Sequence, residues 1–258
     1  MKDKTIGFIG GGRIARIFLD AMKPHKERPQ NIVVCDTDPR VRGQLEARFG
    51  SMILVCDDHA AAAEQDIVFI ALHPPLIPEI MGQIKRHVQQ NAVVVSLAPK
   101  WTVTRLSDLL GGFSRIVRML PNAPSVIHKG YNPVFYPPGI KEEDRILLRE
   151  LFGYFGESPE VEETKIEGYA IITGMGPTYL WFQLYELLHL GQSFGLSEKE
   201  LSDALPAMVK GTVDTMFGEY SREEVLDLIP VKPIGEHEAE WTGVYREKLT
   251  ALYAKIKP

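Results

Sequence analysis

The fold of this chain is decided by residues 6–15, which read Ile-Gly-Phe-Ile-Gly-Gly-Gly-Arg-Ile-Ala. Apolar side chains run directly into three glycines, and an amphipathic segment follows as far as Pro24. This order predicts a β-strand, a tight turn and the start of an α-helix. Gly10, Gly12 and Ala15 have the spacing G-x-G-x-x-A, which is typical of turns that bring a pyrophosphate against a helix N-terminus.

Each residue type in this turn suits a dinucleotide. Gly10 lets the backbone turn sharply, Gly12 leaves room for a phosphate beside the main chain, and Ala15 lets the helix pack closely on the strand. The first helical residues, Arg13 and Ile14, present backbone N–H groups to the anion. We therefore predict a dinucleotide-binding site here, with a purely structural turn as the alternative.

An acidic residue follows at the distance that such a site requires. Asp36 ends the apolar run 31–35, about 20 residues after the turn, where a carboxylate can hydrogen-bond the ribose 2′-hydroxyl. Its charge would repel a 2′-phosphate unless Arg40 or Arg42 supplied a compensating cation. We treat both arginines as ordinary solvated helix positions and therefore expect NAD(H) rather than NADP(H).

The order of apolar runs predicts an α/β fold built on a doubly wound parallel sheet. Strand-like runs alternate with helical patterns such as 40–49 and 76–88. A pair of short strands is expected at 131–136 and 158–161, on either side of a helix at 141–152. The longer apolar runs fall at 5–9, 31–35, 52–55, 66–71, 92–97 and 115–119.

After residue 161 the extended runs give way to helical ones. We therefore place a dinucleotide-binding domain at residues 1–161 and an all-helical domain at 162–258. The segment 176–194 is apolar almost all the way round, which predicts a helix that is covered on every side. A second copy of the chain would cover it in a homodimer, or in a higher oligomer of dimers. Burial within its own subunit is the alternative.

The bulk composition argues against several classes of partner. The formal net charge is −5, and Lys and Arg are scattered along the 258 residues, so we expect no nucleic acid and no anionic membrane as partner. No apolar run approaches the ~20 residues that a membrane span needs. The chain begins directly with a predicted core strand, with no room for a signal peptide. We expect a cytoplasmic protein.

The two cysteines, Cys35 and Cys56, fall in or beside predicted strands and show no motif spacing. We expect packed thiols in a reducing compartment, and neither a disulfide nor a metal site. No cluster of His, Cys, Asp and Glu has metal-ligand spacing, so no metal is expected.

The ligand site should lie at the carboxyl ends of the strands, as in other open parallel sheets. The segment Thr173-Gly174-Met175-Gly176 opens a predicted helix, and its backbone donors would suit a substrate carboxylate or carboxamide; close packing is the alternative. Asn122, held between two prolines, could hydrogen-bond the nicotinamide amide, while His73 could equally be structural. The expected cofactor residues at these strand ends are Leu72, His73, Pro74, Ala98 and Asn122.

These segments, in this order, resemble those of the pyrroline-5-carboxylate reductases over residues 5–216. The strongest parts are the glycine turn, residues 94–98, Arg-Met-Leu-Pro-Asn-Ala-Pro at 118–124, and Thr-Gly-Met-Gly-Pro-Thr-Tyr at 173–179. The resemblance implies a Rossmann domain, an interlocked helical dimer domain, and hydride delivery from NAD(P)H to a C=N carbon. The substrate would be pyrroline-5-carboxylate, on the route to proline, or a related imine.

The chain departs from this family pattern in four places. Relatives have Ala-Val-Lys-Pro where it has Ala-Leu-His-Pro at 71–74, and Ala-Ala-Gly where it has Ala-Pro-Lys at 98–100. Many relatives have Asn-Arg at 36–37, where Asp-Thr again favours NAD(H). The substrate loop Ser-Pro-Gly-Gly-Thr-Thr is missing, and Lys-Pro-Ile-Gly-Glu-His at 232–237 takes its place.

In this last segment, Glu236 and His237 would replace hydroxyls that hold the substrate carboxylate near the imine nitrogen. His237 could then donate a proton to the product nitrogen, because an imidazolium is a stronger acid than a hydroxyl. Lys232 could bind an anionic substrate group. With Thr173, Glu236 and His237 are the expected catalytic residues; a plain surface connector is the alternative.

Three other functions are weighed against imine reduction. An NADP oxidoreductase that uses the deazaflavin F420 would share the first domain, although the large apolar residues after Thr173 disfavour a wide cleft. A β-hydroxyacid dehydrogenase would need a lysine in the helix 177–195, which has none. A non-catalytic regulator that binds NAD(H) would bind the cofactor without turning over an imine.

Overall fold

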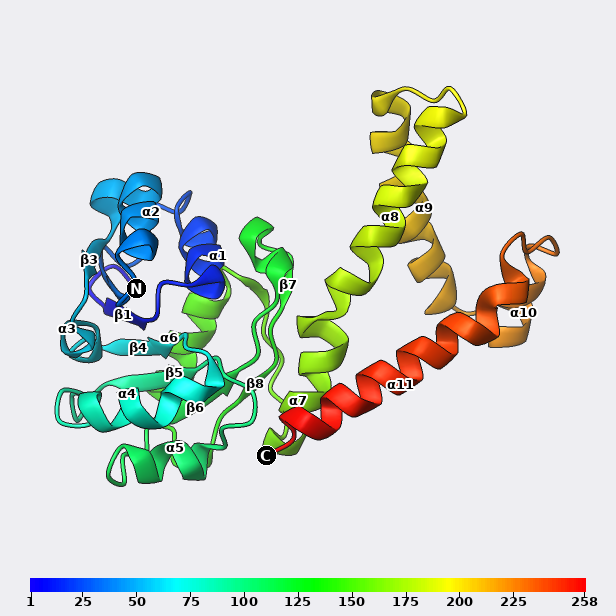
Figure 1. Ribbon diagram of the computed structural model, residues 1–258. Coiled ribbons are helices and arrows are strands. Elements are labelled where there is room, and N and C mark those ends of the chain that lie inside the picture. The colour runs from blue at the N-terminus through cyan, green and yellow to red at the C-terminus, as the bar shows by residue number, and fades with distance from the viewer. The chain divides into compact units, whose positions relative to one another are not determined.

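The glycine turn follows the first strand of a mostly parallel sheet, as the computed structural model of residues 1–258 shows (Figure 1). Neighbouring strands are parallel except for the last pair, which is antiparallel. The predicted doubly wound sheet is confirmed. In order across the sheet the strands are β3 (Leu54–Cys56), β2 (Asn31–Cys35), β1 (Thr5–Ile9), β4 (Ile67–Ile70), β5 (Val93–Ser96), β6 (Ile116–Met119) and β8 (Val134–Phe135).

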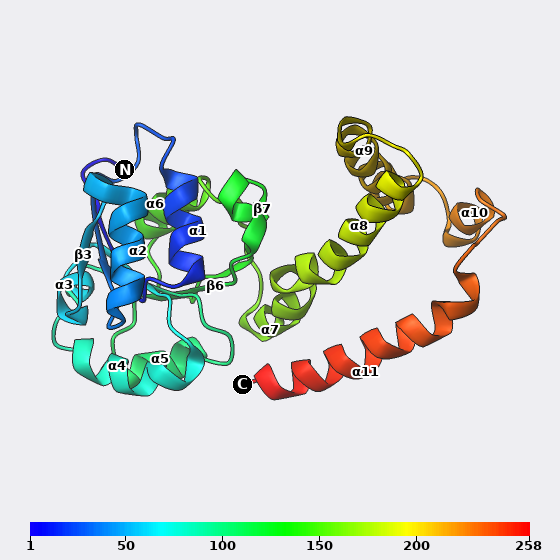
Figure 2. The ribbon, with the colours of Figure 1, turned by 45° about the horizontal axis from the view of Figure 1, so that its top comes forward.

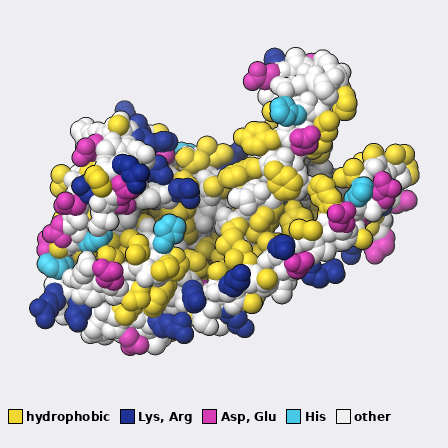
Figure 3. Space-filling view, viewed as in Figure 1, with side chains coloured by type: hydrophobic (Ala, Val, Ile, Leu, Met, Phe, Trp, Pro, Cys, Tyr) yellow, Lys and Arg dark blue, Asp and Glu magenta, His cyan; other side chains and the backbone are white.

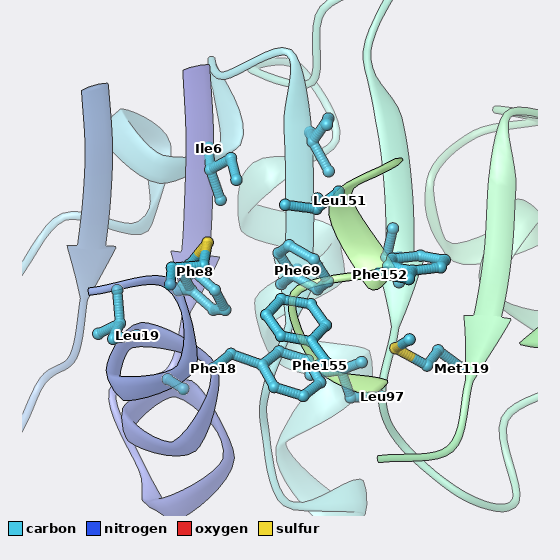
Figure 4. Packing of buried hydrophobic residues seen from close by; sticks show 14 of the residues in the cluster. Ile6, Phe8, Phe18, Leu19, Phe69, Leu97, Met119, Leu151, Phe152 and Phe155 are labelled. Carbon is cyan, nitrogen blue, oxygen red and sulfur yellow. The ribbon is translucent and has the colours of Figure 1, made fainter. Parts of the chain in front are cut away.

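Helices cover both faces of this sheet (Figure 2), which is why its strands are apolar almost throughout. On one face Phe8 stacks on Phe69 with ring centroids 4.7 Å apart, and Phe18 stacks on Phe155 at 3.9 Å (Figure 4). The helices of this face are α1 (Arg13–Met22), α2 (Pro39–Phe49) and α6 (Glu142–Phe152). Those of the other face are α3 (His59–Ala63), α4 (Ile77–Ile84) and α5 (Val103–Leu109).

The strand expected at 131–136 is divided into two, and the strand expected at 158–161 is wrong, since the strand lies earlier, at 156–157. β7 (Gly130–Tyr131) pairs with β9 (Gly156–Glu157) in a separate two-stranded sheet, while β8 joins the main sheet. An isolated bridge links Val134 to Glu160. The division falls at Asn132-Pro133, because a proline cannot donate to a strand ladder.

The expectation of two separate thiols is wrong. Cys35 and Cys56 are register partners on the neighbouring parallel strands β2 and β3, with Cα atoms 4.7 Å apart, and they form a disulfide. This spacing lies within the range that a disulfide needs. Because Cys35 and Cys56 are bonded to each other, they provide no support for a reducing compartment.

The chain divides into two compact units, residues 1–175 with 253–258 and residues 176–252. The division at residue 175 lies later than the boundary expected at residue 161. Residues 162–175 belong to the first unit because Glu163 and Glu167 pair with Arg118 of β6, and Asn122 donates a hydrogen bond to the Thr173 carbonyl.

The second unit is helical throughout, as expected. Its long, apolar helix α8 (Gly176–Ser193) contacts α9 (Glu198–Met216) and α11 (Glu238–Ile256) but keeps many large side chains exposed, so complete burial within its own unit is not observed (Figure 3). The unit's elements are α8, α9, α10 (Arg222–Asp227), the short turn η6 (Gly235–His237) and most of α11. The large side chains more than 40% exposed on or just after α8 are Leu180, Trp181, Phe182, Tyr185, Leu187, Leu190 and Phe194.

No helix in the structure combines the length and the hydrophobicity that crossing a bilayer requires.

Candidate functional site

The two outer glycines of the turn meet different surroundings. Gly10 has φ +97°, and a Cβ there would lie 2.5 Å from the Ala71 carbonyl oxygen, so only glycine fits. A Cβ at Gly12 would meet no atom within 4 Å. Gly10 is therefore demanded by the fold, whereas Gly12 borders an open space that a ligand can enter.

The helix that follows this turn has an N-terminus suited to an anion. Gly12 is the N-cap of α1, and neither a capping side chain nor an acidic residue occupies the first turn. The backbone N–H groups of the first helical residues are thus available to a phosphate. Arg13 is exposed and forms no ion pair, while Ala15 is fully buried against the sheet.

Asp36 lies directly beside the turn. Its Oδ2 accepts a hydrogen bond from the Gly11 amide at 2.8 Å, and its Oδ1 accepts one from the Asp38 amide at 2.9 Å. These bonds hold the carboxylate at the carboxyl end of β2, where a bound dinucleotide would place its adenosine ribose.

Both arginines near Asp36 are engaged elsewhere. Arg42 donates through Nη1 to the carbonyl oxygens of Asp36 and Thr37, at 2.9 and 3.0 Å. Arg40 pairs with Asp38, and the hydrogen bond from the Arg40 amide, helped by its guanidinium, lowers the pKa of the Asp38 carboxyl. Neither guanidinium is directed toward a ligand by these contacts.

The loop after β4 lies against the glycine turn. The Cβ position of Gly10 would be 3.2 Å from Leu72 Cδ2, so Leu72 is brought to the predicted site. His73 is exposed and its ring makes no hydrogen bond, while the Pro74 carbonyl accepts from Trp101 Nε1 at 3.1 Å. Ala98, after β5, is 4% exposed.

Asn122 has a structural task in addition to the predicted one. It is 6% exposed, and its Oδ1 accepts from the Tyr131 amide at 3.1 Å while its Nδ2 donates to the Thr173 carbonyl at 3.4 Å. Its own amide donates to Asn132 Oδ1. Asn122 thereby joins the end of β6 to the segment that carries Thr173; its contact with nicotinamide stays a prediction.

Thr173 and Gly174 lie in a π-helical turn, η5 (Ala170–Gly174), rather than at a plain helix start. The Thr173 hydroxyl donates to the Tyr169 carbonyl at 3.0 Å, and the Gly174 Cβ position is 3.5 Å from Leu120 Cδ2. The turn thus lies on the carboxyl end of β6. Single π-helical turns are frequent at functional sites.

The segment 232–237 lies in the second unit. His237 is half exposed, with Nδ1 3.3 Å from Glu240 Oε2 and Nε2 3.5 Å from Glu236 Oε1. Lys232 and His237 line one cavity of about 310 Å³, together with Ile234, Trp241 and Tyr245. The structure therefore brings Lys232 and His237 to a common cavity wall.

One group of polar residues was missed by the sequence analysis. Arg118 on β6 is 1% exposed and pairs with Glu167 and Glu163, which lie on segments far along the chain. The available signal was a pair of arginines, Arg115 and Arg118, within the otherwise apolar run 115–119.

Comparison with known proteins gives two kinds of similarity. A family profile described as NADP oxidoreductase coenzyme F420-dependent matches residues 5–100. Curated pyrroline-5-carboxylate reductases match more of the chain. The protein from Corynebacterium melassecola is 28% identical over 85% of this chain and 82% of its own length, and that from Pisum sativum is 24% identical over 98% and 94%.

Solved structures share the fold of the whole chain. The Plasmodium falciparum pyrroline carboxylate reductase, solved with NADP bound, has a TM-score of 0.83 at 18% identity and covers 100% of this chain and 98% of its own. The Coxiella burnetii pyrroline-5-carboxylate reductase has a TM-score of 0.71 at 24% identity, over 98% and 94%. The similarity therefore extends through both the sheet unit and the helical unit.

Proposed function

We infer that this chain is a divergent member of the pyrroline-5-carboxylate reductase family, and we propose that it transfers hydride from a reduced nicotinamide cofactor to the carbon of a C=N bond. The observation that carries the proposal is the open, uncapped glycine turn beside Asp36, in a chain whose fold matches that of such a reductase over all of residues 1–258. The substrate is pyrroline-5-carboxylate or a related cyclic imine.

The residues at the turn fit a dinucleotide. The open space at Gly12 accommodates a pyrophosphate, the first amides of α1 bind it, and Arg13 adds a positive charge. When bound, the cofactor supplies the hydride. The protein's contribution is to hold its nicotinamide at the carboxyl ends of β4, β5 and β6, beside Leu72, Ala98 and Asn122.

We further propose that the chain prefers NAD(H). The Asp36 carboxylate stands where the ribose 2′-hydroxyl would bind, and a 2′-phosphate would meet its charge at short range. Arg40 and Arg42, the nearest cations along the chain, are held by Asp38 and by backbone carbonyls. Both guanidiniums are therefore engaged with partners other than a 2′-phosphate.

We propose Thr173–Gly176 as substrate-binding residues and, within the helical unit, Lys232 as a residue that binds an anionic substrate group and His237 as a proton donor. Backbone donors of the π-helical turn and the Lys232 ammonium suit a carboxylate. Reduction adds hydride to carbon and leaves a nitrogen that takes up a proton, which His237 can donate, with Glu236 beside it.

We also propose that the chain forms a homodimer through its helical unit. The α8–α9 groove has a volume of about 640 Å³, is almost wholly apolar and is lined by Trp181, Leu184, Leu188, Leu205 and Val209. Exposed apolar surface of this extent is typical of an interface. Because α8 is apolar along its whole length, we propose that helices α8 and α9 of a second copy of the chain cover this groove.

One other catalytic function is favoured by a specific observation. The family profile that matches residues 5–100 is named for coenzyme F420, and it covers the same strands and turn that we assign to the cofactor. A deazaflavin would then replace the imine as the partner of NADP(H). The match ends before the Thr173 turn and the helical unit, where the reductase relatives continue.

The deciding experiment measures oxidation of NADH and of NADPH by the purified chain with pyrroline-5-carboxylate, then with a panel of cyclic imines and with oxidised F420. We expect turnover with pyrroline-5-carboxylate or another imine, and a higher kcat/KM with NADH. Turnover only with F420 would replace the proposal by the deazaflavin function. Cofactor binding without any turnover would favour a regulator that binds NAD(H).

A further inference from the structure

A buried charge network lies under the carboxyl end of β6, and the proposed reaction makes no direct use of it. The Arg118 side chain is 1% exposed; its Nη2 is 2.5 Å from Glu167 Oε1 and its Nη1 is 3.3 Å from Glu163 Oε1. Glu167 is also 1% exposed. Because burying charges is costly, apolar residues would serve simple packing at least as well. The network therefore calls for a role other than stability.

The same carboxylates hold the loop that follows β5. The Lys100 amide donates to Glu167 Oε1 at 2.9 Å, and the Val103 amide donates to Glu163 Oε1 at 2.7 Å. Lys100 has φ +75°, in the left-handed region that residues with a side chain seldom adopt. Such a conformation persists where its surroundings enforce it, and it is found most often at functional sites.

The network also reaches the segment that carries Thr173. Glu167 lies on α7 (Ile166–Tyr169), which continues directly into the π-helical turn η5. Asn122, four residues after Arg118, donates to the Thr173 carbonyl. Thr173 is thus tied to β6 by two independent links, the Arg118–Glu167 ion pair and the Asn122 amide.

We propose that Arg118, Glu163 and Glu167 form a positioning network that fixes Thr173–Met175 relative to the strand ends that hold the nicotinamide. This inference rests on the proposed function, which places the imine beside Thr173. Arg118 is the central positioning residue, because its rigid, forked guanidinium contacts two carboxylates at once. It acts through α7 and the β5 loop rather than on the reacting atoms, from which its burial separates it.

The test compares isosteric neutralisations of two buried carboxylates, Glu167 on α7 and Asp144 on α6, each paired with an arginine on or next to β6. Glu167→Gln removes the charge but keeps an oxygen that can accept from the Lys100 amide. Asp144→Asn is the matched control, because the Asp144 side chain is only 10% exposed and pairs at 2.7 Å with Arg115, which directly precedes the amino end of β6. The readouts are the thermal midpoint, the Kd of NADH, kcat and KM for the imine, and amide hydrogen exchange over residues 170–175.

For Glu167→Gln we expect kcat to fall by about tenfold or more, since small misplacements of reacting groups are costly. Exchange over 170–175 should accelerate, while the Kd of NADH, set at the glycine turn, should stay within about twofold. The control should lower the thermal midpoint comparably and leave kcat within about twofold. Equal losses of kcat in the two variants, or an unchanged kcat and exchange rate in Glu167→Gln, would overturn the proposal.

A second variant and a readout that needs no turnover complete the experiment. If Glu167→Gln does not fold, Arg118→Lys takes its place: it keeps the charge but not the two-armed contact, and the same split between kcat and NADH affinity is expected. If the unmodified chain reduces no imine, the proposed function fails on that result alone. The hydrogen-exchange comparison then still decides whether the network fixes residues 170–175, because it needs no turnover.

Discussion

At the scale of single residues, the two outer glycines of the turn differ in whether the fold leaves room for a side chain. Gly10 is enclosed by the Ala71 carbonyl and has a positive φ, whereas Gly12 faces open space. Substitution at the first position therefore probes the fold, and substitution at the second probes the ligand. The Asp36 carboxylate has both roles, because it accepts from the Gly11 and Asp38 amides and also stands where the cofactor ribose would bind.

Gly12→Ala should weaken NADH binding by about tenfold or more, equivalent to about 1.4 kcal/mol or more of lost binding free energy, because the methyl group occupies the space of the pyrophosphate. The thermal midpoint should not fall, since the structure has room for the added Cβ. Gly43→Ala, at an equally open position on α2, is the control and should leave the Kd unchanged. Unaltered NADH binding in Gly12→Ala would show that no pyrophosphate lies there.

Asp36→Asn should shift the cofactor preference toward NADPH. Removing the carboxylate charge relieves repulsion of a 2′-phosphate, so the ratio of kcat/KM for NADPH to that for NADH should rise by about tenfold, or about 1.4 kcal/mol. Asp57→Asn, which neutralises an exposed carboxylate 3.9 Å from Arg42, should leave this ratio unchanged. If both variants raised this ratio equally, the cofactor preference would depend on the overall surface charge and not on Asp36 in particular.

At the scale of elements, the edge strand β3 is joined to β2 by more than its backbone ladder. The disulfide between Cys35 and Cys56 lies at the ends of these strands, one residue before Asp36. The Asp36 amide also donates to the Cys56 carbonyl at 3.1 Å. The disulfide therefore holds the short edge strand β3 against β2 directly beside Asp36, the residue proposed to bind the cofactor ribose.

Reduction of this disulfide should lower the free energy of unfolding by about 3 kcal/mol, the usual effect of a bridge that closes a loop of this length. Urea unfolding with and without a dithiol reductant measures the difference. With or without the reductant, the Cys56→Ser variant should have about the same free energy of unfolding as the reduced wild-type protein. Titration of two free thiols in the unfolded, untreated protein would contradict the bridge.

At the scale of the whole molecule, the helical unit exposes an apolar face that a single chain does not cover. A homodimer would bury it, and sedimentation should show twice the chain mass of 29.0 kDa. Tyr185→Glu, which places a charge on a side chain 70% exposed on α8, should produce monomers. Leu54→Glu, at a position 63% exposed on β3, is the control and should stay dimeric. A wild-type monomer at micromolar concentration would refute the dimer.

The sequence by itself determined the glycine turn, the alternation of strands and helices and the apolar nature of α8, because each depends on patterns within one short segment. Only the tertiary structure decided the Cys35–Cys56 pairing, the Asn122–Thr173 bond and the Arg118–Glu167 network. Each of these joins residues at least 21 positions apart, through strand register or the docking of α7 on the sheet. Local periodicity carries no information about such contacts, since it specifies which face a residue occupies but not what lies opposite.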